Sequence, residues 1–204
     1  MSGISISRIG GKAHHMENIQ ARLQDVVITP ELLRRADRPA KSFAGTLALE
    51  EIAAMTPQGS EAILQALCRI CVQLCDCGSS GVNLLEKGED GGHFRWIVIE
   101  GTLKPYQGYI APGDHSPCGF VCEQKSPQLL SHSARYFEWI QAVDLPIVES
   151  LIAPLYRDKD EIIGTMWLVS HDEDRRFDRE DLRVLTMLGS HAAAALKLYE
   201  SMYQ

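Results

Sequence analysis

Two pairs of extended segments constrain the fold of this 204-residue chain more than any other feature of its sequence. The first pair runs from Gly81 to Leu85 and from Phe94 to Glu100, and the second from Glu149 to Tyr156 and from Ile162 to Ser170. A polar stretch, 89–92 in the first pair and 157–160 in the second, separates the two members. Strands joined by such short connections pair antiparallel. The sequence therefore predicts an antiparallel sheet that contains two hairpins.

Helical patterns flank this predicted sheet in the sequence. From Ser60 to Leu74, apolar residues recur at spacings of three and four, and Gly78 follows as a stop signal. After the second pair, Asp178 is a suitable cap for a long helix that reaches Tyr203. The predicted helices thus precede and follow the predicted strands along the sequence. This arrangement predicts an α+β fold with the helices packed on one face of the sheet.

Residues 1–58 are predicted to hold a flexible N-terminus and short helices, and residues 59–204 to form the main domain with its long C-terminal helix. The short helices are expected over 16–27, from Thr29-Pro30-Glu31 onward, and over 47–55.

A long segment without periodicity, residues 102–125, follows the first hairpin and contains Gly, Pro and aromatic residues. A short strand at 128–130 and a short helix at 135–142 are predicted after it. Irregular segments of more than about 12–15 residues in a compact domain are usually functional. The predicted site is therefore placed in this mid-section.

The order of several motifs along the chain resembles the GAF domains found ahead of bacterial sensor histidine kinases. These motifs are Phe94-Arg95-Trp96, Ser116-Pro117-Cys118-Gly119, Leu130-Ser131-His132, Gly164-Thr165-Met166-Trp167-Leu168-Val169 and Arg176-Phe177-Asp178. The resemblance covers roughly residues 25–200. It implies a GAF fold of roughly six antiparallel strands, with the N- and C-terminal helices on one face and a ligand pocket under the mid-section on the other.

The resemblance also implies a regulatory domain that senses a small molecule in bacterial two-component signal transduction. The chain ends at Gln204 without a phospho-acceptor or ATP-binding domain, so kinase activity is not expected. None of the motifs GxGxxG, Walker loop, GxSxG and HExxH is present, and the chain is expected not to be an enzyme. A ligand-free dimerisation scaffold is an alternative to the sensing role.

Nine residues of this region are the predicted ligand-binding residues, because aromatic rings with a few polar groups are typical of small-molecule pockets. The same aromatic side chains would also be suitable core residues under irregular backbone. The predicted residues are Trp96, Tyr106, Tyr109, His115, Cys118, Phe120, His132, Phe137 and Trp139.

Cys118 and Cys122 support a second functional hypothesis, a thiol-based redox enzyme that resembles the free methionine sulfoxide reductases of GAF fold. A thiol near a helix N-terminus is expected to have a lowered pKa. In the alternative interpretation, Ser116 caps a turn, Pro117 takes its first position and Cys118 packs inward. The sequence that is characteristic of the reductases around their catalytic cysteines is not found here.

The sequence argues against one cofactor and leaves two candidates. Phytochrome-like GAF domains carry a Cys-His pair shortly before the second hairpin, whereas residues 135–139 read Arg-Tyr-Phe-Glu-Trp. A bilin is therefore not expected, and haem or a small metabolite remains a candidate, with His115 and His132 as haem ligands. Four more cysteines, Cys68, Cys71, Cys75 and Cys77, contain a single CxxC inside a helical pattern, which favours core packing over a metal site.

The final helix carries two neighbouring apolar stripes. One stripe is Leu182, Leu185, Gly189, Ala192, Leu196, Tyr199 and Tyr203, and the other is Val184, Leu188, His191, Ala195, Leu198 and Met202. A sheet covers only one stripe, so the second is expected to meet the N-terminal helices or a second subunit. We expect a homodimer through this helix and a separate histidine kinase or other signalling protein as partner.

Charge and hydropathy narrow the remaining function classes. The net charge is −7 and no basic stripe is present, so no nucleic-acid partner is expected. No apolar run approaches the roughly 20 residues that span a bilayer, and the first residues lack a signal peptide. These features predict a cytoplasmic protein without a membrane segment.

Overall fold

The computed structural model describes residues 23–39, 58–88 and 92–203, and its centre is a six-stranded antiparallel sheet. In sequence order the strands are β1 (Ser79–Glu86), β2 (His93–Gly101), β3 (Ile110–Pro112), β4 (Gln128–Ser131), β5 (Glu149–Tyr156) and β6 (Ile162–Ser170). Across the sheet their order is β3-β2-β1-β6-β5-β4. The predicted α+β fold class is confirmed, with the two predicted hairpins as its four central strands.

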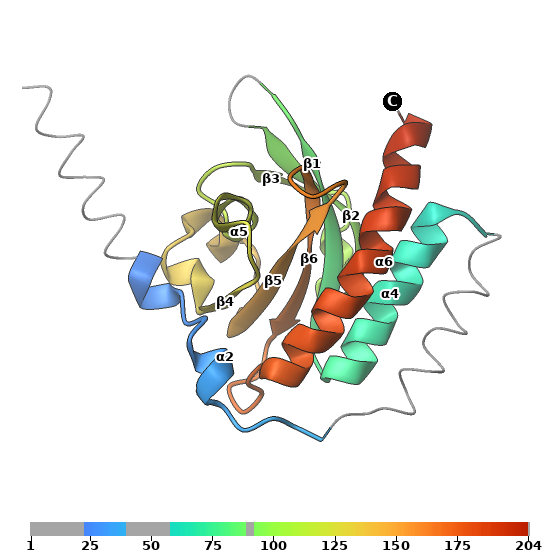
Figure 1. The fold of residues 1–204 in the computed structure, drawn as a ribbon. Helices are drawn as coiled ribbons and strands as arrows, with labels where there is room; N and C mark the ends of the chain where they lie inside the picture. The colour runs from blue at the N-terminus through green and yellow to red at the C-terminus, as the bar shows by residue number, and fades with distance from the viewer. Residues whose placement is uncertain (1–22, 40–57, 89–91, 204) are drawn as a thin grey trace, which may run out of the picture.

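Two long helices lie side by side over one face of this sheet (Figure 1). They are α4 (Ser60–Cys75) and α6 (Arg179–Tyr203). Asp178 caps α6 as predicted, because its Oδ1 accepts hydrogen bonds from the backbone N–H groups of Glu180 (2.9 Å) and Asp181 (3.1 Å). Ser60 is the first residue of α4, not its cap, and Asp76 ends the helix in a left-handed conformation.

The four cysteines of the first helical region lie in the core between the helices and the sheet. Cys68, Cys71, Cys75 and Cys77 are all buried, and burial raises the pKa of each thiol above its ordinary value. Among the described residues, no three His, Cys, Asp or Glu side chains converge as they would around a metal ion. Core packing is therefore the role that the structure gives these thiols.

Helix α4 packs along α6, and residues of both helices belong to one core cluster with the sheet. Buried residues come from both predicted stripes, including Leu185 and Leu196 of the first and Val184 and Leu188 of the second. Leu198 and Met202, near the C-terminal end of α6, are 58% and 63% exposed.

The opposite face of the sheet carries a separate layer, formed by the mid-section and the short helices that follow β4, and this layer is called the mid-section layer below (Figure 1). Its elements are η2 (Lys104–Tyr106), α5 (Pro117–Gln124), η3 (Ser133–Arg135) and η4 (Glu138–Ala142). The helix predicted over 135–142 is wrong in type, because the chain forms two short 3-10 turns there. Strand β3 was not predicted, since three residues are too few to set a pattern.

A segment before α4 packs against the β4 edge of the sheet. Val27 forms an isolated bridge with Leu130, and the Ile28 N–H donates to the Leu129 carbonyl over 2.8 Å. Helix α2 (Glu31–Arg34) then begins after Thr29 and Pro30, as predicted, and Leu32 is buried. Most of the helix predicted over 16–27, and all of that over 47–55, lies outside the described residues.

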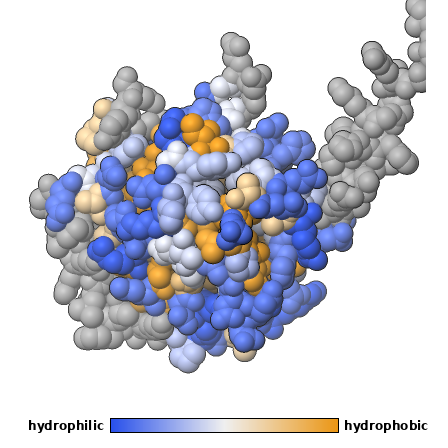
Figure 2. Space-filling view, turned by 180° about the vertical axis from the view of Figure 1, so that it is seen from behind, coloured by the Kyte–Doolittle hydropathy of each residue, from blue (hydrophilic) through white to orange (hydrophobic). Residues whose placement is uncertain are grey.

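The molecular surface seen from behind mixes hydrophilic areas with interrupted hydrophobic ones (Figure 2). No helix within the described ranges combines the length and apolar character that crossing a membrane requires.

Candidate functional site

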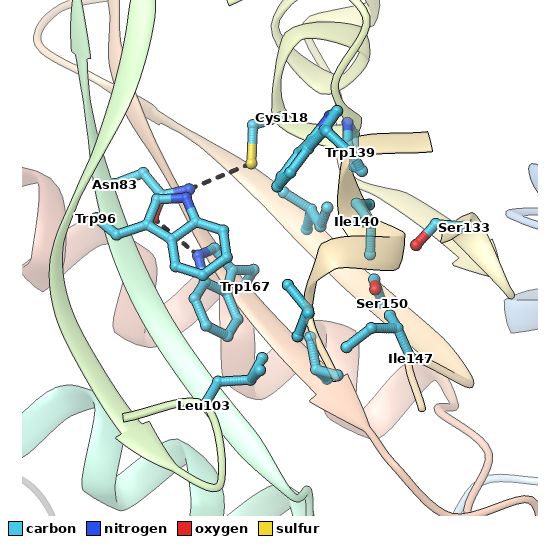
Figure 3. A pocket seen from close by; sticks show the side chains of 14 residues that line it. Asn83, Trp96, Leu103, Cys118, Ser133, Trp139, Ile140, Ile147, Ser150 and Trp167 are labelled. Carbon is cyan, nitrogen blue, oxygen red and sulfur yellow. Dashed lines mark hydrogen bonds between the residues drawn. The ribbon is translucent and has the colours of Figure 1, made fainter. Parts of the chain in front are cut away.

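A cavity of about 60 Å³ lies between the sheet and the mid-section layer. Strands β1, β2, β5 and β6 supply one wall, with Asn83, Trp96, Ser150, Ile152, Trp167 and Val169. The mid-section layer supplies the other wall, which includes Leu103, Pro117, Cys118, Ser133, Trp139 and Ile140. Figure 3 shows these side chains grouped around the cavity. It lies on the face opposite α4 and α6, where the GAF resemblance placed a pocket.

A hydrogen-bonded chain of side chains fixes the sheet wall of the cavity. The Trp167 indole N–H donates to Asn83 Oδ1 over 3.0 Å, and Asn83 Nδ2 donates to Cys118 Sγ over 3.3 Å (Figure 3). Asn83 Nδ2 also lies 3.5 Å from Thr165 Oγ1. A buried amide is costly unless its donors and acceptors are bonded. Asn83 therefore holds the Trp167 ring and the Cys118 thiol in fixed positions.

The turn that delivers Cys118 has the geometry expected for Ser-Pro-Cys-Gly. Ser116 caps α5, since its Oγ accepts from the Gly119 N–H over 3.0 Å, and Pro117 is the first helical residue. The expected lowering of the thiol pKa is wrong. Burial raises the pKa of Cys118 to about 11 and that of Cys122 to about 12, because a thiolate is poorly solvated there.

These raised pKa values predict slow alkylation of both thiols. At pH 7.5 we expect iodoacetamide to modify Cys118 and Cys122 at least about 100-fold more slowly than a free cysteine peptide. The rate should rise about tenfold for each pH unit and level off only above pH 11, because Cys118 is half deprotonated at its pKa of about 11. Peptide mass spectrometry after timed quenching measures both rates. Modification of Cys118 as fast as the peptide at pH 7.5 would contradict the raised pKa.

Three tryptophan rings line the cavity, Trp96 and Trp167 on the sheet wall and Trp139 on the mid-section wall. The Trp96 ring contacts Trp167 (centroids 5.6 Å apart) and meets Trp139 edge-on at 6.4 Å. Tyr109 stacks on Trp139 at 6.1 Å and is itself 42% exposed. The aromatic cluster therefore extends from the buried sheet face to the surface.

Of the nine predicted ligand-binding residues, Trp96, Cys118 and Trp139 line the cavity. Tyr106 and Phe137 belong to the apolar cluster around it, and the Tyr106 hydroxyl accepts from the Asp144 N–H over 3.3 Å. Tyr109 stacks outside on Trp139, and Phe120 is half-buried without lining the cavity.

The two predicted histidines lie outside the cavity lining. His115 is exposed, and its backbone carbonyl accepts from the Trp139 indole N–H over 3.1 Å. The His132 ring bonds to Ser131 Oγ (2.8 Å) and to Glu173 (2.9 Å), which occupies both ring nitrogens. Neither histidine therefore contributes to the cavity wall.

Five of the lining residues that were missed come from the strands, and the other six come from the segments between the strands. Asn83, Ser150, Ile152, Trp167 and Val169 reach the cavity through the alternation of side chains along β1, β5 and β6. One signal was present: Asn83 stands between Val82 and Leu84, and a polar residue inside an apolar strand usually has a specific partner.

The cavity does not fit a bilin or a haem. Its volume of about 60 Å³ is far below the 300–1,000 Å³, roughly, of sites for drug-sized ligands. None of its lining residues is charged, so the carboxylates of either group would have no partner there. No histidine lines it as an axial ligand, and Cys118 is bonded to Asn83.

Comparison with known proteins finds one family model, described as GAF domain, that matches residues 58–197. No curated protein matches the chain. Among solved structures, the chain is similar to the GAF domain of an Acinetobacter phosphoenolpyruvate-protein phosphotransferase, with a TM-score of 0.65 and 10% identity over 81% of this chain and 98% of that one.

Two further solved structures resemble the chain. The phycoerythrobilin-bound GAF domain of a cyanobacterial phytochrome has a TM-score of 0.62 and 15% identity, over 80% of this chain and all of that one (100%). The GAF-B domain of DevS from Mycobacterium smegmatis has a TM-score of 0.54 and 18% identity, over 69% and 94%. Identities this low establish a shared fold and nothing about a shared ligand.

Proposed function

The chain belongs to the GAF domain family, and we propose that it is a regulatory domain that binds a small molecule in cytoplasmic bacterial signal transduction. The observation that carries the proposal is the cavity between the sheet and the mid-section layer, with its tryptophan-rich wall and the bonded Asn83. A preformed apolar cavity with few polar groups is the usual form of a small-molecule site.

The sheet supplies a physical route from this cavity to α6. Ile152 and Trp167 line the cavity, whereas their neighbours Leu151 and Leu168 pack in the core beneath α4 and α6. A ligand that displaces β5 or β6 would therefore change the surface on which α6 rests. Regulation further requires that the ligand binds two arrangements of these elements with different affinity.

Blocking the cavity tests this function. We expect Val143→Phe to fill the cavity, because Val143 lines it and is only partly buried. Leu145→Phe is the matched control, since Leu145 packs nearby without lining the cavity. In a thermal-shift screen of metabolites with roughly four to six non-hydrogen atoms, which suit a cavity of about 60 Å³, at least one should raise the Tm of the wild type and of Leu145→Phe by about 2 °C or more, but not that of Val143→Phe.

Hydrogen exchange measured with the metabolite found in this screen should then change protection within α6, which regulation requires and binding alone does not. A screen in which no metabolite stabilises the wild type, or a hit that stabilises Val143→Phe equally, would contradict the proposal.

We propose that this domain is not an enzyme. No observation favours the thiol-enzyme hypothesis, because the Cys118 thiol has a raised pKa and is held by Asn83. Purified protein should reduce no methionine sulfoxide above the rate of the Cys118→Ser variant.

We also propose that the chain pairs with a second copy through the C-terminal end of α6 and signals to a separate histidine kinase or similar protein. Leu198 and Met202 are spaced four residues apart on the helix and are 58% and 63% exposed, so a partner helix would bury both. The double variant Leu198→Glu/Met202→Glu should be monomeric by light scattering at tens of micromolar, where the wild type is dimeric. A wild type that is strictly monomeric would refute the dimer.

A further inference from the structure

Two polar groups on residues that line the cavity have no hydrogen-bond partner among the residues that the structure describes. They are the Trp96 indole N–H and the Ser133 hydroxyl, on residues that are 8% and 1% exposed. The other two tryptophans of the chain donate their indole N–H groups, Trp139 to the His115 carbonyl and Trp167 to Asn83. Buried polar groups are almost always bonded, so each unpartnered group calls for an explanation.

The two groups belong to opposite walls of the cavity. Trp96 comes from β2 in the sheet, and Ser133 comes from η3 in the mid-section layer. In Figure 3 the Trp96 ring lies beside Trp167, and Ser133 lies on the other side of the cavity. A molecule that fills the cavity would therefore contact both residues. An indole N–H only donates, so it needs an acceptor, whereas a hydroxyl both donates and accepts.

The lining also restricts the charge of such a molecule. The polar side chains of the lining are an asparagine, two serines and a cysteine, besides the indole N–H groups, and none of the lining side chains carries a formal charge. An ion transferred into this cavity would lose its hydration without gaining a counter-charge. The lining therefore selects against anions and cations alike.

The volume of the cavity limits the size of the ligand. Each water-sized group needs about 10–15 Å³ of cavity volume. A cavity of about 60 Å³ therefore accommodates roughly four to six non-hydrogen atoms. The rings of Trp96 and Trp167 on one side and Ile140 on the other favour a flat, apolar body.

Resting on the proposed function, we propose that the ligand of this cavity is a small, uncharged heterocycle or amide. Its acceptor atom takes the Trp96 indole N–H, and a second polar group bonds to the Ser133 hydroxyl. The ligand thus supplies the partners that the protein leaves unfilled.

The three tryptophans make the proposal directly observable by NMR, because a ¹⁵N-labelled sample has three indole N–H signals. Each signal is assigned with a Trp→Phe variant. The probes are pyridine, which is uncharged at pH 7.5 and has an acceptor nitrogen, and benzene, its isostere without one. We expect pyridine to move the Trp96 signal downfield in a saturable way, more than those of Trp139 and Trp167, and to bind about tenfold more tightly than benzene.

Two variants separate the donor from the cavity. Trp96→Phe should bind pyridine and benzene with equal affinity, since it keeps a ring and loses the N–H. Ser133→Ala should weaken acetamide, whose amide reaches a second group, by about threefold or more and leave pyridine unchanged. Acetate, which has the same number of non-hydrogen atoms as acetamide, should bind to neither protein.

The proposal is overturned by equal Trp96 shifts with pyridine and benzene, by acetate binding as tightly as acetamide, or by no response to any of the uncharged probes. These results would leave the proposed function standing if the metabolite screen still finds a ligand that Val143→Phe excludes. A screen without any ligand would instead remove the function on which this proposal rests.

Discussion

Replacing Glu149 with glutamine is expected to lower the free energy of unfolding by about 3 kcal/mol, because it breaks a buried ion pair from one side. Glu149 is 1% exposed, and both of its oxygens accept from the Arg35 guanidinium, over 2.9 and 2.8 Å. Glu149 Oε2 also accepts from the Phe177 N–H over 2.9 Å. Glutamine keeps the shape but leaves the Arg35 side chain, only 20% exposed, without its counter-charge.

This ion pair joins three segments that are far apart in the sequence. Arg35 follows α2, Glu149 begins β5, and Phe177 precedes α6. Arg35 Nη1 also donates to the Phe177 carbonyl over 2.7 Å. Loss of the Arg35–Glu149 ion pair should therefore loosen two parts of the molecule. One is the segment that contains α2, and the other is the start of α6, the helix that we propose carries the signal.

Urea denaturation followed by tryptophan fluorescence measures the effect. Glu31→Gln is the matched control, because its pair with Arg34 is exposed and should cost no more than about 1 kcal/mol. In a double-mutant cycle, Arg35→Gln and Glu149→Gln should together cost much less than the sum of their separate effects. Strictly additive effects would contradict a direct interaction.

The parts of this fold that could be predicted from sequence are those set by a local period. Strands β5 and β6 have the bounds that were expected, because each is a mostly apolar segment next to turn residues. The cap at Asp178 was equally predictable, since capping depends on residues two or three positions away.

The cavity could be predicted in place but not in composition. The mid-section has no period, so the sequence indicated where a site would lie without indicating which side chains turn inward. His132 looked like a candidate ligand, yet it bonds to Glu173, 41 residues away. Asn83 and Trp167, which organise the sheet wall, meet only because β1 and β6 pair across 84 residues. Contacts of this range follow from topology and leave no local pattern.

The Gly164→Ala variant is expected to lose about 3 kcal/mol of stability or more, a large effect for one methyl group. A Cβ on Gly164 would stand 2.0 Å from the backbone carbonyl oxygen of Asn83 and 3.0 Å from a Leu196 methyl group. The first of these atoms is part of the β1–β6 ladder and cannot move without displacing the strand. Only glycine therefore lets β6 approach β1 at this point. The position of Gly164 inside an apolar strand did not indicate this close approach.

The displaced strand is the one that carries Asn83, so the same variant should also disturb the cavity. We expect the Trp167 indole N–H signal to shift upfield as its bond to Asn83 lengthens. Gly189→Ala is the control: its Cβ would lie 3.5 Å from Leu155, an ordinary contact, and alanine within α6 should stabilise the protein by roughly 0.5–1 kcal/mol. Thermal or urea unfolding distinguishes the two. If Gly164→Ala were as stable as the wild type, the close approach of β1 and β6 would be wrong, and with it the geometry that fixes Asn83 in the cavity wall.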